Sequence, residues 1–439
     1  MRPVVVLLAL LLPTAWADEP VVFRERLQVG DRYHVKTRVD LTGSFTPSSL
    51  PTKGGEAKTP PVIRLQGASS IDYEERILAL ADNGQVSRTV RLNRRFDFAR
   101  TLAGQKQQIG LRPEIKRLVI LRKGPSEIPF SPDGPLTWGE LDVVRTDVFV
   151  PALLGLLPDE PVRVGQRWTA SELAVLELTD LEKIDAGTLE CRLESVSSPK
   201  KNRIASIRFT GTLKGIGEDG PVSHRLTGSV LYDLDEQFLT TVILNGTMTL
   251  TNPKGQEMGK VEGRFALERS RVVQAEELSD AALKGVKLEP DEENTRLLYD
   301  NPVQGVRFVY PRSWRIAREA EGQIALDSSS GNGLIITLDA AGKTPSVKQL
   351  QEEARAWMTK NKGTILREIP TATLRTRPRL ETFSLETQMQ GQSFWMDYYV
   401  TDQPEGGASI AARLLPKELA RSRKEVEAIA RSLIRTAKP

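Results

Sequence analysis

The chain has 439 residues, 39% of them hydrophobic and 27% charged, a composition that excludes a disordered protein. With 61 Lys and Arg against 57 Asp and Glu, the formal charge of +4 gives little long-range field, and no nucleic-acid partner is expected. The single cysteine, Cys191, excludes an internal disulfide, so packing alone must hold the fold together.

Residues 1–17 have the features of a signal peptide. Arg2 precedes an apolar run from Val4 to Leu12, and Ala15-Trp16-Ala17 fits a small-x-small cleavage site. No later run approaches the roughly 18 apolar residues of a membrane span, so the mature chain is expected to have no transmembrane segment. The sequence thus predicts an exported protein, periplasmic or extracellular. A retained N-terminal anchor is the alternative.

Residues 18–275 read as a β-rich domain. Apolar residues alternate with polar ones at 31–41, 62–80, 85–92 and 118–121, which predicts strands. The Pro-, Gly- and Ser-rich stretch 44–61 predicts a long exposed loop. The segment 91–123 holds ten Lys or Arg and only two acidic residues. We expect a solvated face or a loop-rich rim there, and contact with an anionic surface is the alternative.

Four glycines recur at intervals of 17 or 18 residues after Leu173, each followed by apolar residues at strand spacing. The pattern predicts an antiparallel meander of long strands joined by short turns. Glycine in a strand centre marks sharp bending or close backbone approach, so we expect a strongly curved sheet, a half-barrel. The glycines are Gly211, Gly228, Gly246 and Gly263.

An apolar insert, Trp138–Trp168, precedes this meander. Thr137 and Glu140 have the capping-box spacing of a helix start, and Pro151 would kink that helix or begin a second one. One interpretation is a ligand- or membrane-contacting helix; the favoured one is a plug packed inside the sheet. The candidate ligand-binding residues are Val148, Phe149, Leu153, Leu154 and Leu157.

The curved sheet with its apolar insert resembles the LolA and LolB family of bacterial periplasmic lipoprotein carriers. This resemblance rests on the overall pattern of strands and insert, so no residue is carried over. It implies a protein that encloses an apolar ligand.

After an acidic, Ala-rich linker at 276–297, residues 298–439 form a second domain. A helix is expected after Thr344, its predicted N-cap, and a second amphipathic helix closes the chain. The phrase Phe308-Val309-Tyr310-Pro311-Arg312-Ser313-Trp314 and the closing helix resemble the PsbP-like fold, an antiparallel sheet flanked by helices. That family includes a photosystem II extrinsic protein and a Ran-binding factor, so the resemblance implies protein binding and no catalytic residues. The whole chain is therefore expected to be α+β.

The sequence contains few of the residue patterns that catalysis needs. Its only histidines, His34 and His224, lie in strand patterns and are expected on the sheet surface, and Cys191 is expected in the core. No metal site, cofactor or catalytic residue is predicted, and neither a G-x-S-x-G turn nor a phosphate-binding loop occurs.

These observations predict an exported, non-catalytic protein that binds a lipid or other apolar ligand, or a protein partner, at the bacterial cell envelope. The alternative is a carboxylate-dependent hydrolase acting on envelope polymers. It would need two acidic side chains in one cleft, about 5 to 10 Å apart.

Overall fold

The computed structural model describes residues 19–46, 61–124, 126–199, 202–218, 220–272 and 276–437. The expected signal peptide and most of the expected loop 44–61 lie outside these residues. The described chain divides into two compact units. Unit 1 takes the residues up to Pro129 together with Asp142–Leu288, and unit 2 takes Phe130–Leu141 together with the residues from Glu289 onward. Unit 2 therefore includes residues from the expected first domain.

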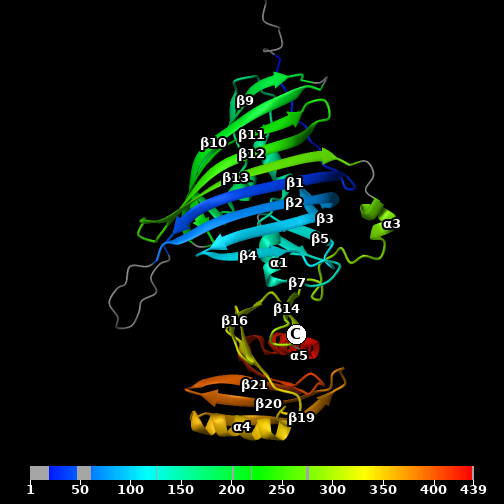
Figure 1. Cartoon of the computed structure of the whole chain (residues 1–439), viewed down its shortest axis with the longest axis vertical. Coiled ribbons are helices and arrows are strands. Elements are labelled where there is room, and N and C mark those ends of the chain that lie inside the picture. The colour runs from blue at the N-terminus through cyan, green and yellow to red at the C-terminus, as the bar shows by residue number, and fades with distance from the viewer. Residues whose placement is uncertain are drawn as a thin grey trace, which may run out of the picture. The chain divides into compact units, whose positions relative to one another are not determined.

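Unit 1 is built on an open, curved sheet of twelve strands (Figure 1). Their order is β6-β5-β3-β2-β1-β13-β12-β11-β10-β9-β8, with β4 paired to β3. The strands are β1 (Arg32–Phe45), β2 (Ile63–Leu80), β3 (Val86–Leu102), β4 (Gln105–Gly110), β5 (Arg117–Lys123), β6 (Ser126–Phe130), β8 (Arg167–Thr169), β9 (Lys183–Ser197), β10 (Ile204–Gly217), β11 (Gly220–Asp233), β12 (Phe238–Thr251) and β13 (Glu257–Arg271). Strands β10 to β13 pair in antiparallel succession, which confirms the predicted meander.

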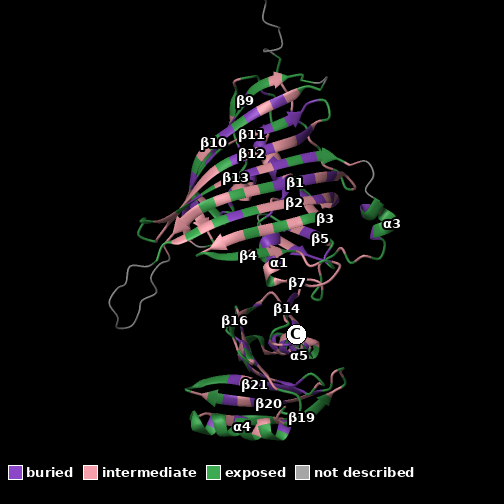
Figure 2. Ribbon diagram, in the orientation of Figure 1, coloured by how far each residue is buried: buried purple, intermediate pink, exposed green. Residues whose placement is uncertain are grey.

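One face of this sheet, here called the inner face, is buried, and the other, the outer face, is exposed. In β1, Tyr33, Val35 and Thr37 are buried, whereas Lys36 and Arg38, on the other face, are exposed. Figure 2 shows the same alternation of buried and exposed residues along the neighbouring strands. Successive side chains of a strand point to opposite faces, so this pattern assigns each residue to one face.

The apolar insert forms two short helices. Helix α1 (Trp138–Arg145) begins at the predicted capping box: Glu140 N donates to Thr137 Oγ1 (3.1 Å), and Thr137 N donates to Glu140 Oε2 (2.7 Å). The 3₁₀ helix η1 (Val150–Leu156) follows, with Pro151 in its first turn. Helix α2 (Glu172–Thr179) follows, and Ser171 caps it, because its Oγ accepts a hydrogen bond from Ala174 N.

The repeated glycines lie on the inner face of the meander. Gly263 is opposite Gly246, and Leu226 lies between Gly246 and Gly211 on the same row of paired residues. A Cβ atom on Gly211 would overlap the carbonyl oxygen of Thr188 on the next strand. The backbones therefore approach closely there, as expected for glycine in a strand centre.

Unit 2 contains a seven-stranded and a four-stranded sheet. The first has the order β16-β17-β18-β22-β21-β20-β19 and the second β23-β15-β14-β7, where β7 and β14 run parallel. The strands are β7 (Leu136–Thr137), β14 (Leu297–Asn301), β15 (Val306–Tyr310), β16 (Trp314–Ala320), β17 (Gln323–Ser328), β18 (Gly333–Leu338), β19 (Thr364–Leu374), β20 (Leu380–Met389), β21 (Gln392–Thr401), β22 (Ala408–Leu414) and β23 (Ile434–Arg435). The expected linker 276–297 contains η2 (Glu276–Leu278) and α3 (Asp280–Leu283) and ends in β14.

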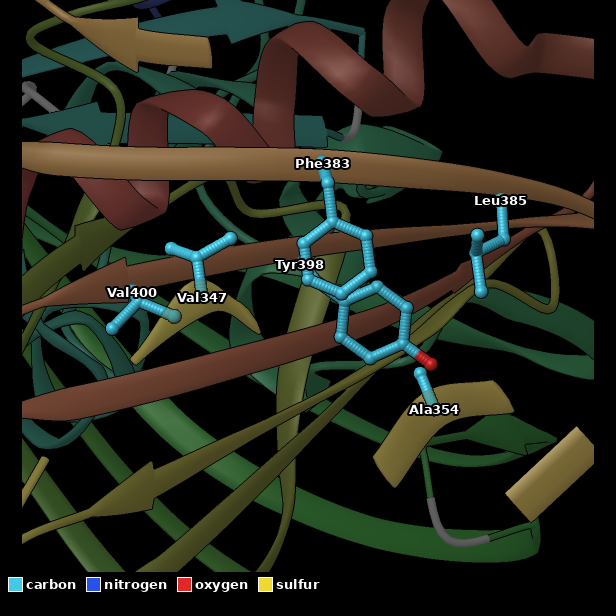
Figure 3. Close-up of a cluster of buried hydrophobic side chains, with 6 residues drawn as sticks. All are labelled: Val347, Ala354, Phe383, Leu385, Tyr398 and Val400. Carbon is cyan, nitrogen blue, oxygen red and sulfur yellow. The ribbon is translucent and has the colours of Figure 1, made fainter. Parts of the chain in front are cut away.

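Helix α4 (Val347–Lys360) packs on one face of the seven-stranded sheet, and Figure 3 shows that contact. The rings of Phe383 and Tyr398 stack with their centroids 4.5 Å apart, beside Val347 and Ala354 of the helix. The helix begins later than expected, because Ser346 and not Thr344 is its N-cap. Ser346 forms a capping box with Gln349, while Thr344 Oγ1 donates to Asp402 (2.8 Å).

Helix α5 (Leu419–Ser432) packs on the opposite face, since Asp397 of β21 accepts from Arg423 (2.8 and 2.9 Å). The phrase at 308–314 forms β15 and the turn after it. Trp314 is fully buried, and its Nε1 donates to Glu425 of α5 (2.8 Å). This bond ties the start of β16 to the closing helix.

Candidate functional site

The five candidate residues of the insert do not share one exposed face. Phe149 and Leu153 are fully buried, whereas Val148, Leu154 and Leu157 are half-buried. Helix η1 also packs closely on α2, since a Cβ at Gly155 would overlap the Ser171 side chain. The observed packing therefore accounts for these side chains without a ligand.

A buried charge cluster fixes the insert against the inner face. Arg91 Nη1 donates to Asp147 (2.8 Å) and its Nε to Glu75 (3.0 Å). Its third nitrogen donates to the carbonyl oxygen of Val148 (3.2 Å), and its guanidinium lies 4.6 Å from the centroid of the Tyr73 ring. Arg91 was expected on a solvated face, and that expectation is wrong. The periodicity of β3 shifts at a bulge opposite Asp72 and Tyr73, so Arg91 points inward.

A second buried arginine, also from the basic segment, joins two carboxylates. Arg122 Nη1 donates to Glu127 (2.8 Å) and to Glu177 of α2. The other oxygen of Glu177 accepts from the backbone N of Phe149, and Arg122 lies 5.0 Å from the centroid of the Phe149 ring. These contacts connect β5, β6, α2 and η1.

Glu127 and Glu177 line a cleft of about 590 Å³, together with Asp147 and Asp180. Burial, and next the charge of Glu177, raise the pKa of Glu127 to about 7, against the lowering effect of Arg91 and Arg122. Glycoside hydrolysis needs two carboxyl groups that both reach the substrate. Both oxygens of Glu177 are engaged by the protein, and so are both oxygens of Asp147. The geometry of the carboxylates in this cleft therefore fits a structural role better than catalysis.

The raised pKa of Glu127 predicts a pH-dependent stability. The folded protein holds this proton more tightly than the unfolded chain, so the free energy of unfolding should fall as pH rises from about 4.5 to about 7. We expect Glu127→Gln to flatten this part of the profile, measured as the urea midpoint by far-UV circular dichroism. Glu257→Gln, at an exposed position, should leave the slope unchanged. A slope that is equally steep in Glu127→Gln would contradict the assignment.

At one end of the strands, the side chains on the inner face are less buried than elsewhere on that face. There, two successive rows of paired residues carry mainly apolar side chains that remain half-exposed. We call these the apolar rows; their half-exposed members are Phe45, Ile63, Leu65, Leu102, Met248 and Leu250. Half-exposed apolar side chains gathered on one surface are typical of a binding site.

A buried histidine lies beside the apolar rows. His224 pairs across the sheet with Met248 and Leu213, and its Nε2 has no hydrogen-bond partner within the described residues. Burial lowers its pKa to about 4, so the imidazole is neutral at pH 7. The expectation that His224 lies on the sheet surface is wrong, because even-numbered residues of β11 face inward here. The unpartnered Nε2 atom is itself buried beneath the surface of the inner face.

Sequence reasoning did not find the apolar rows, although their alternation is visible in the sequence. The strands are long enough to extend beyond the insert, but only the pairing register shows which residues do so. Within the described part of the chain, no group of three or more potential metal ligands occurs. None of its helices has the length and apolar character needed to span a bilayer.

No protein-family model matches the chain. No curated protein is significantly similar to it in sequence either.

Solved structures give weak likenesses only. Cyanobacterial PsbP from Synechocystis sp. PCC 6803 is 11% identical over 32% of this chain and 92% of its own, with a TM-score of 0.25. The Ran-binding protein Mog1p of Saccharomyces cerevisiae is 11% identical over 32% of this chain and 96% of its own, with a TM-score of 0.26. Lipovitellin is 10% identical over 56% of this chain and 26% of its own, with a TM-score of 0.32. The likeness to the PsbP-like fold is thus limited to about a third of the chain.

Proposed function

We propose that this protein is a non-catalytic binding protein that holds the apolar chain of an amphiphile on the apolar rows of unit 1. The observation that carries the proposal is the half-exposure of Phe45, Ile63, Leu65, Leu102, Met248 and Leu250 on one face. Burying each of these side chains would contribute about 1 kcal/mol or more, since apolar surface contributes about 25 cal/mol per Å².

In this proposal the curved sheet acts as a half-barrel, and the insert closes only one part of its inner face. The Arg91 cluster holds the insert in place, so the unfilled part is a permanent feature and needs no opening movement. The leader-like residues 1–17 support a role after export, at the envelope of a bacterium, where amphiphiles are abundant.

The proposal can be tested with a fluorescent fatty acid and two variants of adjacent residues. Met248 lies on the inner face of β12 and Thr249 on its outer face. We expect Met248→Glu to weaken probe binding by about tenfold or more, because a carboxylate among apolar groups is poorly solvated. Thr249→Glu should bind as the wild type does, since its side chain points away from the site.

Native mass spectrometry of the protein purified from its own host provides a second measurement. We expect a co-purified amphiphile in the wild type and less of it in Met248→Glu. A wild-type protein that neither binds the probe nor carries an amphiphile would refute the proposal. Equal loss of binding in both variants would place the site elsewhere.

A further inference from the structure

The outer face of unit 1 carries a groove of about 1180 Å³ that crosses seven strands, from β11 through β12, β13, β1, β2 and β3 to β4. On most of these strands the lining is a run of three residues, such as Asp40, Leu41 and Thr42. Leu41 points to the inner face, so only its backbone reaches the groove, and Asp40 and Thr42 form the two walls. Strands about 4.8 Å apart give a groove roughly 29 Å long.

The row of glycines forms much of the floor of this groove. Gly67, Gly263 and Gly246 stand in the middle position on β2, β13 and β12. Glycine in a strand centre allows local bending, and here it recurs on the same row across the sheet. Two of the four regularly spaced glycines, Gly246 and Gly263, therefore lie in the groove, on the face opposite to the apolar rows.

The walls are polar, and their unpaired charges are positive. Asp40 is paired with Arg38 (2.9 Å), and Glu262 with Lys260 (2.6 Å). Among the residues that the structure describes, Arg225, Arg264 and Lys106 have no carboxylate within ion-pair distance. The rest of the walls consists mainly of hydroxyl and amide side chains, for example those of Thr42, Thr247, Asn245 and Gln66.

We propose that this groove binds an acidic polysaccharide in an extended conformation. Its length suits a polymer, and its threonine, asparagine and glutamine side chains offer donors and acceptors to sugar hydroxyls. Arg225, Arg264 and Lys106 match the carboxylates of such a chain, because arginine pairs with carboxylates through two parallel hydrogen bonds.

Two other polymers fit the groove less well. A peptide that binds to a sheet usually pairs with a free strand edge, and this groove crosses strands whose backbone groups already pair with their neighbours. Single-stranded nucleic acid binds by stacking its bases on aromatic side chains, and the described lining contains none. The site is distinct from the apolar rows, so either proposal can fail without the other.

The test measures binding of a polyuronate by isothermal titration calorimetry at low salt, with a neutral glucan and oligothymidylate as comparison ligands. We expect Arg225→Ala/Arg264→Ala to lower the affinity for the polyuronate by about tenfold or more. The control Lys348→Ala/Lys360→Ala removes the same charge from exposed positions of α4 and should bind as the wild type does. Neutral glucan should bind at least tenfold more weakly than the polyuronate.

A steric variant separates the groove from a general charge effect. Thr42→Trp fills the groove without changing the charge and should also weaken polyuronate binding by about tenfold. Ser270→Trp, at an exposed outer position of β13 far along the strand, should not. Equal losses in both members of either pair would overturn the proposal. So would oligothymidylate that binds as tightly as the polyuronate, or a wild-type protein that binds no polyuronate.

Discussion

Replacing Arg91 by alanine should lower the free energy of unfolding of unit 1 by about 3–5 kcal/mol, the typical cost of removing one partner from a buried ion pair. Arg91 is 3% exposed, and its loss would leave Glu75 and Asp147 buried without their partner. Burial raises the pKa of Asp147 although Arg91 lowers it, so this site disfavours an uncompensated charge. The measurement is the urea midpoint, with hydrogen exchange read on peptides of β2 and β3.

Arg95→Ala is the matched control on the same strand. Arg95 and its partner Asp97 are 61% and 54% exposed, so losing that pair should cost less than about 0.5 kcal/mol. If Arg91→Ala does not fold, Arg91→Lys provides the measurement. It keeps the charge but loses two of the three directed bonds and should be intermediate. Similar midpoints for Arg91→Lys and the wild type would show that the directed bonds contribute little.

A substitution at Gly211 should have the second large effect. The added Cβ of Gly211→Ala would overlap the carbonyl oxygen of Thr188, and a backbone atom cannot move aside as a side-chain end can. We expect a loss of about 1–3 kcal/mol in the free energy of unfolding, as for other overpacked sites, and the same measurement applies.

Gly263→Ala is the control from the same row of glycines. The nearest atom to its added Cβ would be Asp40 O at 3.8 Å, an ordinary contact distance. This variant should be neutral, or more stable by about 0.4–1 kcal/mol, because alanine restricts the unfolded chain. Equal destabilisation by both substitutions would mean that the row needs glycine for its backbone conformation and not for space.

The sequence predicts well those features that depend on neighbouring residues. The capping box at Thr137 and Glu140 and the meander of β10 to β13 need only local spacing, and both are confirmed. Helix α4 illustrates the limit of local prediction. Thr344 and Ser346 are both acceptable caps, and the choice depends on Asp402, which is distant in sequence.

The candidate site depended on information that the sequence does not contain. Arg91 and Arg95 look alike in a basic segment, yet one is buried and the other exposed because a bulge changes which residues of β3 face inward. The apolar rows likewise depend on how far paired strands extend beyond the insert. His224 could be assigned to a face from its alternation in β11, but its burial depends on Met248 and Leu213 of the adjacent strands.

The chain order of unit 2 has a consequence for synthesis and for engineering. Strand β7 is translated long before its parallel partner β14, since Leu136 pairs with Leu297. On the ribosome, β7 must remain unpaired while most of unit 1 is made. A chain truncated before β14 would keep β7 without its pairing partner. A chain that starts after unit 1 would lack β7. Neither unit is therefore one continuous segment of the chain. Separate expression of unit 2 would require a circular permutation or a graft of residues 130–141.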